Sequence, residues 1–247
     1  HERLVGSEMC IRDRVEFARR GYHCGILDAD ITGPSIPKAF GITEKAQGNE
    51  TTIFPVKSKK YGVDIMSINV LLENESDPVV WRGPVIGGTV RQFWSDTLWD
   101  NVDYLFVDMP PGTGDIQITL SQKLDFSGAV IVSTPQDIAL IDAVKGVNMF
   151  KKVNVPILGI VENMSYYICE HCGARADIFG HEGARKTAEK LGETFLGEIP
   201  LHIAIRENSD AGTPVVYSMP GSAYANAYLA VARQIKDCLL YTSDAAD

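Results

Sequence analysis

Two cysteines three residues apart carry the sharpest chemical signal in the chain. They form Cys169-Glu-His-Cys172, preceded by two tyrosines and an isoleucine and followed by Gly173. Two thiolates at this spacing can hold one metal ion or one edge of an iron–sulfur cluster, but a closed site needs about four protein ligands. Because the chain has no second Cys-x-x-Cys, the motif favours a cluster shared by two copies across a twofold axis.

Three other interpretations of the cysteine pair stay open from the residues alone. His171 or His181 could complete a zinc site, the two thiols could form a redox pair, or they could be incidental. A redox Cys-x-x-Cys usually opens a helix, where the helix dipole lowers the thiol pKa. Gly173 and the aromatic residues before Cys169 instead indicate an exposed loop.

Carboxylates end two short apolar runs elsewhere in the chain. Asp108 follows the run 104–107 and precedes a Pro-Pro-Gly-Thr-Gly turn, while Asp28 and Asp30 close the run 22–28. In an open α/β sheet ligands bind at the carboxyl ends of strands, and a hard cation such as Mg²⁺ prefers oxygen ligands. Paired carboxylates can also position a water for attack on phosphate. The alternatives are a helix-capping Asp108 and an Asx-type turn at Asp28 and Asp30.

The elements that must position these groups alternate between strand and helix. Apolar residues Leu140, Ile141, Val144 and Val147, for example, fall at helical spacing. This alternation predicts one α/β domain with a mostly parallel sheet. Strands are expected at 22–28, 62–69 (at the sheet edge), 104–108, 128–134, 156–162 and 195–199, and helices at 35–41, 85–98, 116–124, 137–152, 183–191 and 221–236. Residues 46–60 are expected to be a polar, exposed excursion.

Composition narrows the function classes. The chain has 247 residues, 45% of them hydrophobic and 22% charged, as in soluble globular domains. Its net charge of −9 argues against nucleic acid as a partner. We find no apolar run near the roughly 20 residues that span a bilayer and no secretory signal, so no membrane partner is expected. Five cysteines without an even framework favour a reducing compartment, the cytoplasm.

Both ends of the chain contain segments that look foreign. Ser7–Arg14 and Cys238–Asp247 resemble translated sequencing-adapter sequence, which should be excluded from fold reasoning. We therefore expect a single domain at 15–237, with 1–14 and 238–247 as non-native tails. Cys10 and Cys238 would then carry no functional weight, and Cys24, on a strand, would belong to the core.

Six motifs in order give the chain a specific family resemblance. Between the two ends it resembles the Mrp-type (ApbC-like) iron–sulfur cluster carrier ATPases, in the deviant-Walker P-loop group that includes MinD and ParA. This resemblance implies a P-loop NTPase-like fold with helices on both faces of the sheet. It also implies a homodimer that binds ATP, magnesium and a [4Fe–4S] cluster, and that works with cluster scaffold proteins and apo iron–sulfur proteins. The motifs are Leu27–Pro37, Trp81–Pro84, Asp108–Asp115, Thr134–Asp137, Val161–Ser165 and Cys169–Cys172.

The resemblance assigns a role to each matching position. Asp30 would orient the attacking water as the first-switch residue, with Asp28 supporting it and the magnesium shell. Asp108 matches the Walker B acid that holds magnesium through water, and Cys169 and Cys172 match the cluster ligands. The remaining nucleotide-binding positions are the second switch Gly112, Thr113, Gly114 and Asp115, the adenine-reading Asn163, and Pro200, which begins a loop beside the base.

One departure from the family pattern is large. The chain has no Gly-x-x-x-x-Gly-Lys-Ser/Thr and no Gly-Lys dipeptide, so the phosphate cradle and its lysine are expected to be missing. We expect an N-terminally truncated chain that has also lost the first strand of its sheet. The parent would be an ATPase, while this chain would be inactive and its sheet would expose an open slot that favours aggregation.

The same residues also leave two competing hypotheses for the function. One is a MinD/ParA-like nucleotide-switched positioning ATPase with a structural zinc loop, which would carry a basic amphipathic C-terminal helix. The segment 224–236 has only Arg233 and Lys236 as basic residues. The other is a metal-binding scaffold that hydrolyses nothing.

Overall fold

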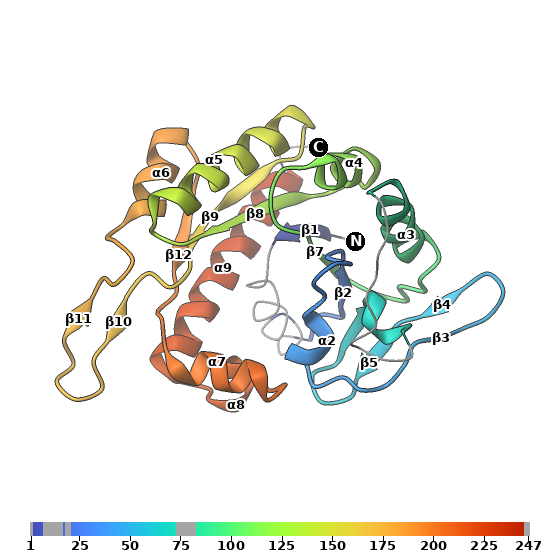
Figure 1. Cartoon of the computed structure of the whole chain (residues 1–247), viewed down its shortest axis with the longest axis horizontal. Coiled ribbons are helices and arrows are strands. Elements are labelled where there is room, and N and C mark those ends of the chain that lie inside the picture. The colour runs from blue at the N-terminus through green and yellow to red at the C-terminus, as the bar shows by residue number, and fades with distance from the viewer. Residues whose placement is uncertain (1, 7–16, 18–20, 73–82, 245–247) are drawn as a thin grey trace.

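The computed structural model describes residues 2–6, 17, 21–72 and 83–244 (Figure 1). Trp81 and Arg82, which begin one of the six motifs, lie outside the described residues. The N-terminal half contains β1 (Glu2–Gly6), β2 (Cys24–Asp28), α2 (Ile36–Ala39), β3 (Gln47–Gly48), β4 (Ile53–Phe54), β5 (Val56–Ser58), β6 (Val63–Met66), a 3-10 turn (Ile68–Val70), α3 (Gly83–Ser95), β7 (Tyr104–Asp108) and α4 (Asp115–Lys123). The C-terminal half contains β8 (Gly128–Ser133), α5 (Asp137–Lys152), β9 (Ile157–Glu162), β10 (Tyr167–Ile168), β11 (Arg175–Ala176), α6 (Gly183–Leu191), β12 (Phe195–Glu198), α7 (Ile203–Asp210), α8 (Val215–Ser218) and α9 (Ala223–Asp244).

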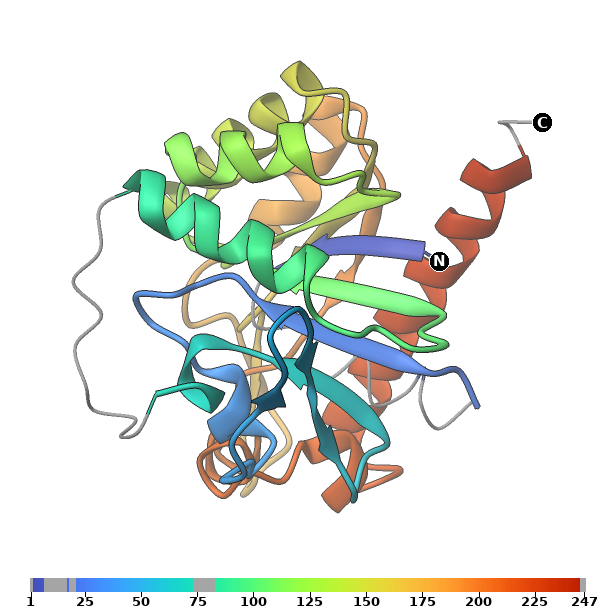
Figure 2. The same ribbon diagram turned by 90° about the vertical axis from the view of Figure 1, so that its right-hand side faces the viewer.

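An eight-stranded sheet forms the middle of the molecule, in the order β12-β9-β8-β1-β7-β2-β6-β5. Every neighbouring pair is parallel except β5 and β6. Helices α3 to α6 run along one side of the sheet and α9 along the other (Figure 2). Strands β2 and β7 are buried over their whole length, as expected for parallel strands covered on both faces. The expected α/β fold with a mostly parallel sheet is confirmed.

The expectation that the sheet lacks its first strand is wrong. Residues Glu2–Gly6 form β1, which lies between β7 and β8 and pairs with both in parallel. The expected open slot is therefore filled, and the aggregation argument built on it no longer holds. The sequence signal was weak because this five-residue strand begins with Glu2 and Arg3 rather than with an apolar run.

The fold also reaches beyond the expected 15–237 on both sides. Besides β1, helix α9 continues to Asp244, and Leu239 is buried against the core. The foreign origin of 1–14 and 238–247 stays a prediction, because packing does not report origin.

Two further segments differ from expectation. The expected polar excursion 46–60 contains the β3–β4 hairpin and β5, so β5 and not the strand at 62–69 forms the sheet edge. Helices α7 and α8 follow Pro200 where only a loop was expected. Helix α7 buries none of its residues, so it carries no apolar stripe by which the sequence could reveal it. No helix in the described part is long and apolar enough to cross a membrane.

Candidate functional site

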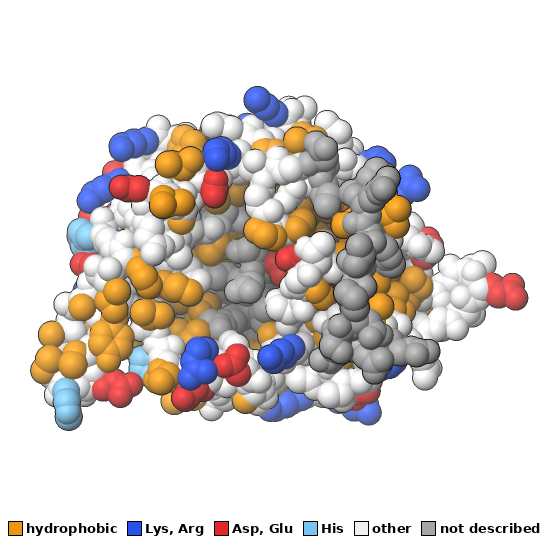
Figure 3. Space-filling view, viewed as in Figure 1, with side chains coloured by type: hydrophobic (Ala, Val, Ile, Leu, Met, Phe, Trp, Pro, Cys, Tyr) orange, Lys and Arg blue, Asp and Glu red, His pale blue; other side chains and the backbone are white. Residues whose placement is uncertain are grey.

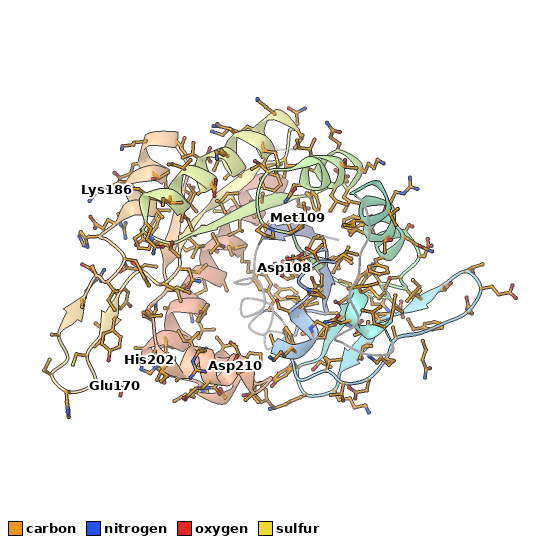
Figure 4. The ribbon with its side chains drawn as sticks, in the orientation of Figure 1. Asp108, Met109, Glu170, Lys186, His202 and Asp210 are labelled. Atoms are coloured by element: carbon orange, nitrogen blue, oxygen red, sulfur yellow. The ribbon has the colours of Figure 1, made fainter. Side chains whose placement is uncertain are left out.

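The carboxyl ends of β2 and β7 bring the two acidic motifs together. Asp28 and Asp108 are paired in register, and the amide of Ala29 donates to the Asp108 carbonyl at 2.8 Å. Both carboxyl groups are buried. Figure 4 places Asp108 and Met109 near the middle of the molecule, and Figure 3 shows this face hollowed there. The strand ends thus supply the oxygen ligands that a magnesium ion would need.

Asp28 organises the loop that follows it. One carboxylate oxygen accepts a hydrogen bond from the Asp30 amide at 3.2 Å, and the other accepts from Ser67 Oγ at 3.1 Å and the Ile36 amide at 3.4 Å. Burial raises the pKa of Asp28 to about 7, although the hydrogen bonds from Ser67 and Ile36 oppose the rise. This side chain is therefore poised between its neutral and charged forms near neutral pH.

Asp30 forms the Asx-type turn that the sequence left as an alternative. Its Oδ1 accepts from Thr32 Oγ1 at 2.8 Å and from the Gly33 amide at 3.1 Å. The side chain is half-buried, and its Oδ2 accepts no hydrogen bond from the described part of the chain. The turn fixes the carboxylate at the strand end, and the water-orienting role of Asp30 stays a prediction.

The loop after Asp108 is held by a residue that the sequence reading missed. Buried Gln117 donates from Nε2 to the carbonyls of Pro110 at 3.1 Å and Pro111 at 2.7 Å. Gly112 has φ +95°, a conformation that favours glycine, and Gly114 precedes α4 as its N-cap. The only sequence signal for Gln117 was a polar residue in the first turn of α4. The Asp115 side chain lies outside the described part.

A cavity of about 420 Å³ lies between this loop, strand β8 and helix α5. Met109, Gly112 and Asn163 line it together with β8 and α5. The Asn163 amide donates to the Ser133 carbonyl at 2.7 Å, which holds the end of β9 against β8. Of the other expected nucleotide contacts, Thr113 lines a separate groove between α4 and α5, and Pro200 is buried.

The cysteine motif forms the tip of a short β-hairpin that projects from the body (Figure 1). The Cys169 amide donates to the Ala174 carbonyl at 2.9 Å, and the Gly173 amide donates back to Cys169 at 2.8 Å. Cys172 is exposed, Cys169 is partly exposed, and both are free thiols. The expectation of an exposed loop is confirmed, and no helix begins at this motif.

The backbone around Cys169 favours its thiolate form. Hydrogen bonding from the Cys172 amide, then from the His171 amide and the Cys172 thiol, lowers the pKa of Cys169 below its ordinary value. Since the thiolate is the metal-binding form of cysteine, the loop is suited to ligation.

One copy of the chain offers only part of a metal site. Within the described ranges, no group of three or more His, Cys, Asp and Glu side chains is arranged to hold a metal ion. His181, one of the two histidines that could complete a zinc site, instead contacts Asp177 at 3.0 Å and Glu182 at 3.4 Å. Exposed apolar side chains gather on the face around the hairpin (Figure 3), including Ile168, Ile178 and Ile203. Such a patch is typical of a protein contact surface.

Comparisons with known proteins give matches over most of the chain. The family model described as "ParA: NUBPL iron-transfer P-loop NTPase" matches residues 7–236. An "Iron-sulfur cluster carrier protein" of Haemophilus influenzae is 49% identical over 229 residues, which cover 93% of this chain and 62% of that protein. The "Iron-sulfur cluster transfer protein NUBPL" of Dictyostelium discoideum is 46% identical, with 94% and 72% covered. The chain thus spans about two thirds of the length of these relatives.

Solved structures show the same fold. A nucleotide-binding protein from Archaeoglobus fulgidus in complex with ADP is 35% identical, with a TM-score of 0.74 over 85% of this chain and 86% of that one. The cell division ATPase MinD of Pyrococcus furiosus has a TM-score of 0.66 over 96% of this chain and 99% of that one, at 18% identity. The second likeness supports the fold alone.

Proposed function

Because the chain belongs to the family of NUBPL-type iron-transfer P-loop NTPases, we propose that it carries a [4Fe–4S] cluster and delivers it to apo iron–sulfur proteins. The cluster is the cargo, and Cys169 and Cys172 of two copies supply its four thiolate ligands. The observation that carries the proposal is the hairpin loop itself. It offers two accessible thiols, one with a lowered pKa, and the described residues supply no further ligand.

A homodimer is the simplest way to complete the site. Each copy contributes two sulfurs, and a cluster of this type needs about four. Exposed apolar side chains beside the loop supply a surface that a second copy could cover. The relatives named as cluster carriers favour this reading over a positioning ATPase with a zinc loop.

Nucleotide hydrolysis is the second part of the proposal. Asp108 would hold magnesium through water, Asp28 would support the loop, and Asp30 would orient the attacking water. Asn163, beside the cavity of about 420 Å³, would meet the adenine edge. Buried carboxylates beside a glycine-containing loop fit a magnesium ion, which would neutralise phosphate charge. Since the sequence contains no Gly-Lys dipeptide, we expect weak nucleotide binding and little hydrolysis by this chain itself.

Anaerobic reconstitution with iron and sulfide tests the cargo. The chain should gain a broad absorption near roughly 400 nm, as thiolate-bound clusters do, at one cluster per two chains. Cys169→Ala and Cys172→Ala should each abolish it. Cys238→Ala, a half-buried thiol on α9, is the matched control and should leave it unchanged. Tight zinc in place of iron, or a cluster that survives both hairpin substitutions, would contradict the proposal.

A further inference from the structure

The hairpin that carries the cysteines is too short to hold its own geometry. Strands β10 and β11 pair at only two positions, Tyr167 with Ala176 and Ile168 with Arg175. An isolated two-stranded hairpin is marginally stable at best in water, even when it is longer. Other contacts must therefore fix the direction in which the loop presents its thiols.

Arg175 makes contacts that close the base of this hairpin. Its Nε donates to Asp177 at 2.9 Å, while Nη1 and Nη2 donate to the two oxygens of Glu198 at 3.3 Å each. The guanidinium also lies over the Tyr166 ring, 4.2 Å from its centroid. Tyr166 precedes β10, Asp177 follows β11 and Glu198 ends β12, so one side chain ties both hairpin strands to the main sheet.

The Glu198 carboxylate that accepts both guanidinium hydrogen bonds is 30% exposed, and it joins two residues, Glu162 and Ser165, that are buried. Glu198 and Glu162 are paired in register on β12 and β9, and Ser165 Oγ lies 3.0 Å and 2.5 Å from their oxygens. One hydroxyl proton cannot serve two carboxylates at once, and the positive charge of Arg175 beside Glu198 offsets repulsion between two neighbouring acids. The hydrogen bonds that Arg175 donates, first those to Glu198 and then that to Asp177, raise the pKa of Arg175 above its ordinary value.

The far end of the network reaches into the core. The second Glu162 oxygen accepts from the Ala184 amide at 2.6 Å, at the start of α6, and both residues are fully buried. The hairpin is therefore anchored through Arg175 to a rigid part of the sheet rather than to another surface loop.

Contact at the hairpin tip is weaker. Glu170, between the two cysteines, lies 3.3 Å from His202 Nε2, and its side chain is 67% exposed (Figure 4). An exposed single ion pair contributes little to stability. Arg175 combines a two-pronged hydrogen bond, a second carboxylate and ring stacking, a combination that lysine cannot reproduce.

We propose that Arg175 is the positioning residue of the Cys169–Cys172 loop. The paired hydrogen bonds from its guanidinium to Glu198 and its packing over the Tyr166 ring fix the direction in which the hairpin presents two thiolates to a second copy. This rests on the proposed function, because four sulfurs from two hairpins must meet around one cluster. Arg175 itself does not touch the cluster.

Arg175→Lys tests the proposal because lysine keeps the positive charge but cannot make the paired hydrogen bonds to Glu198 or pack a planar group over the Tyr166 ring. Arg185→Lys is the matched control, since Arg185 also lies 4.2 Å from a ring centroid, that of Phe195, and faces Glu182, but does so on α6. The first readout is hydrogen exchange of the metal-free chain over residues 166–177. Exchange there should be faster in Arg175→Lys and unchanged in Arg185→Lys.

The second readout is the reconstituted cluster. Arg175→Lys should bind as much iron as wild type at saturation. Its cluster should lose iron to a chelator on the order of tenfold faster, and a tenfold change in rate corresponds to about 1.4 kcal/mol. Its visible circular dichroism should also differ from wild type. Equal hairpin exchange and equal chelation rates in Arg175→Lys and wild type would overturn the assignment.

A double substitution separates positioning from charge compensation. If Arg175 served only to neutralise Glu198, then Arg175→Gln with Glu198→Gln would restore wild-type behaviour in every assay. We expect the pair to recover the melting temperature but to keep fast hairpin exchange and fast iron loss. Absence of a cluster in the wild-type chain would refute the proposed function, while the hydrogen-exchange comparison would still decide the role of Arg175.

Discussion

Asp28 gives the chain a pH-dependent stability that one substitution should remove. Only 1% of its surface is exposed, and burial raises its pKa from 3.8 to about 7. Between these two pH values the folded chain holds a proton at Asp28 that the unfolded chain has released. The free energy of unfolding therefore falls as pH rises through this window, and above pH 7 the ionised side chain remains a fixed destabilising charge.

The raised pKa sets the size of the effect. A rise from 3.8 to about 7 corresponds to about 4 kcal/mol, at about 1.4 kcal/mol per pH unit. Asp28→Asn cannot ionise, yet its amide oxygen can still accept from the Asp30 amide and its amide nitrogen can donate to Ser67. Only the long 3.4 Å contact with Ile36 is lost. Relative to wild type, the variant should gain about 3 kcal/mol between pH 4.5 and 7.5.

Urea unfolding in metal-free buffer at pH 4.5, 6.0 and 7.5 measures this difference. Asp142→Asn is the control, because that exposed carboxylate pairs only with Lys145 on α5 among the described residues. The reasoning is refuted if Asp28→Asn and wild type differ by the same free energy, within ~0.5 kcal/mol, at all three pH values. Added magnesium should stabilise wild type at pH 7.5 and leave Asp28→Asn unchanged if Asp28 supports a magnesium shell.

Four further substitutions have expected outcomes. Glu162→Ala should lower the free energy of unfolding by about 2–5 kcal/mol, because the buried Ser165 hydroxyl and Ala184 amide both lose Glu162 as their hydrogen-bond acceptor. A loss below ~1 kcal/mol in urea unfolding would contradict this expectation. Gly159→Ala should cost more than about 2 kcal/mol, since its φ is +152° and a Cβ would lie 2.6 Å from Leu196 Cγ. Gly88→Ala, in α3 with open space around it, should instead raise the melting temperature, and equal effects at the two glycines would show the packing argument to be wrong. Gln117→Ala should speed hydrogen exchange in the loop 109–114, because the carbonyls of Pro110 and Pro111 lose their donor. Unchanged exchange there would show that Gln117 does not hold this loop.

Much of the sheet could be predicted because its strands are apolar and bounded by turns. The positions of Asp28 and Asp108 at the carboxyl ends of strands were predicted, whereas their pairing in register became visible only in the structure. Strand β1 was missed because residues 1–14 were set aside as foreign and because two charged residues open the strand, and α7 was missed because it buries no side chain. In both cases the element is held by neighbours rather than by its own pattern.

The candidate site was predicted less completely than the fold. The cysteine loop was recognisable because both thiols lie within four residues of sequence. Arg175 was not, since its partner Glu198 is 23 residues away and their contact depends on how β12 pairs with β9. Gln117 was missed for a different reason, because it donates to backbone carbonyls, those of Pro110 and Pro111, and a carbonyl acceptor is the same for every residue type. Side chains that act by supporting others leave little trace in local sequence.

Native mass spectrometry of the anaerobically reconstituted chain tests the central claim most directly. The account predicts one species with the mass of two chains plus a single [4Fe–4S] cluster, and its replacement by cluster-free chains in Cys169→Ala. One cluster on a single chain, or a zinc ion on each chain, would contradict the bridging carrier.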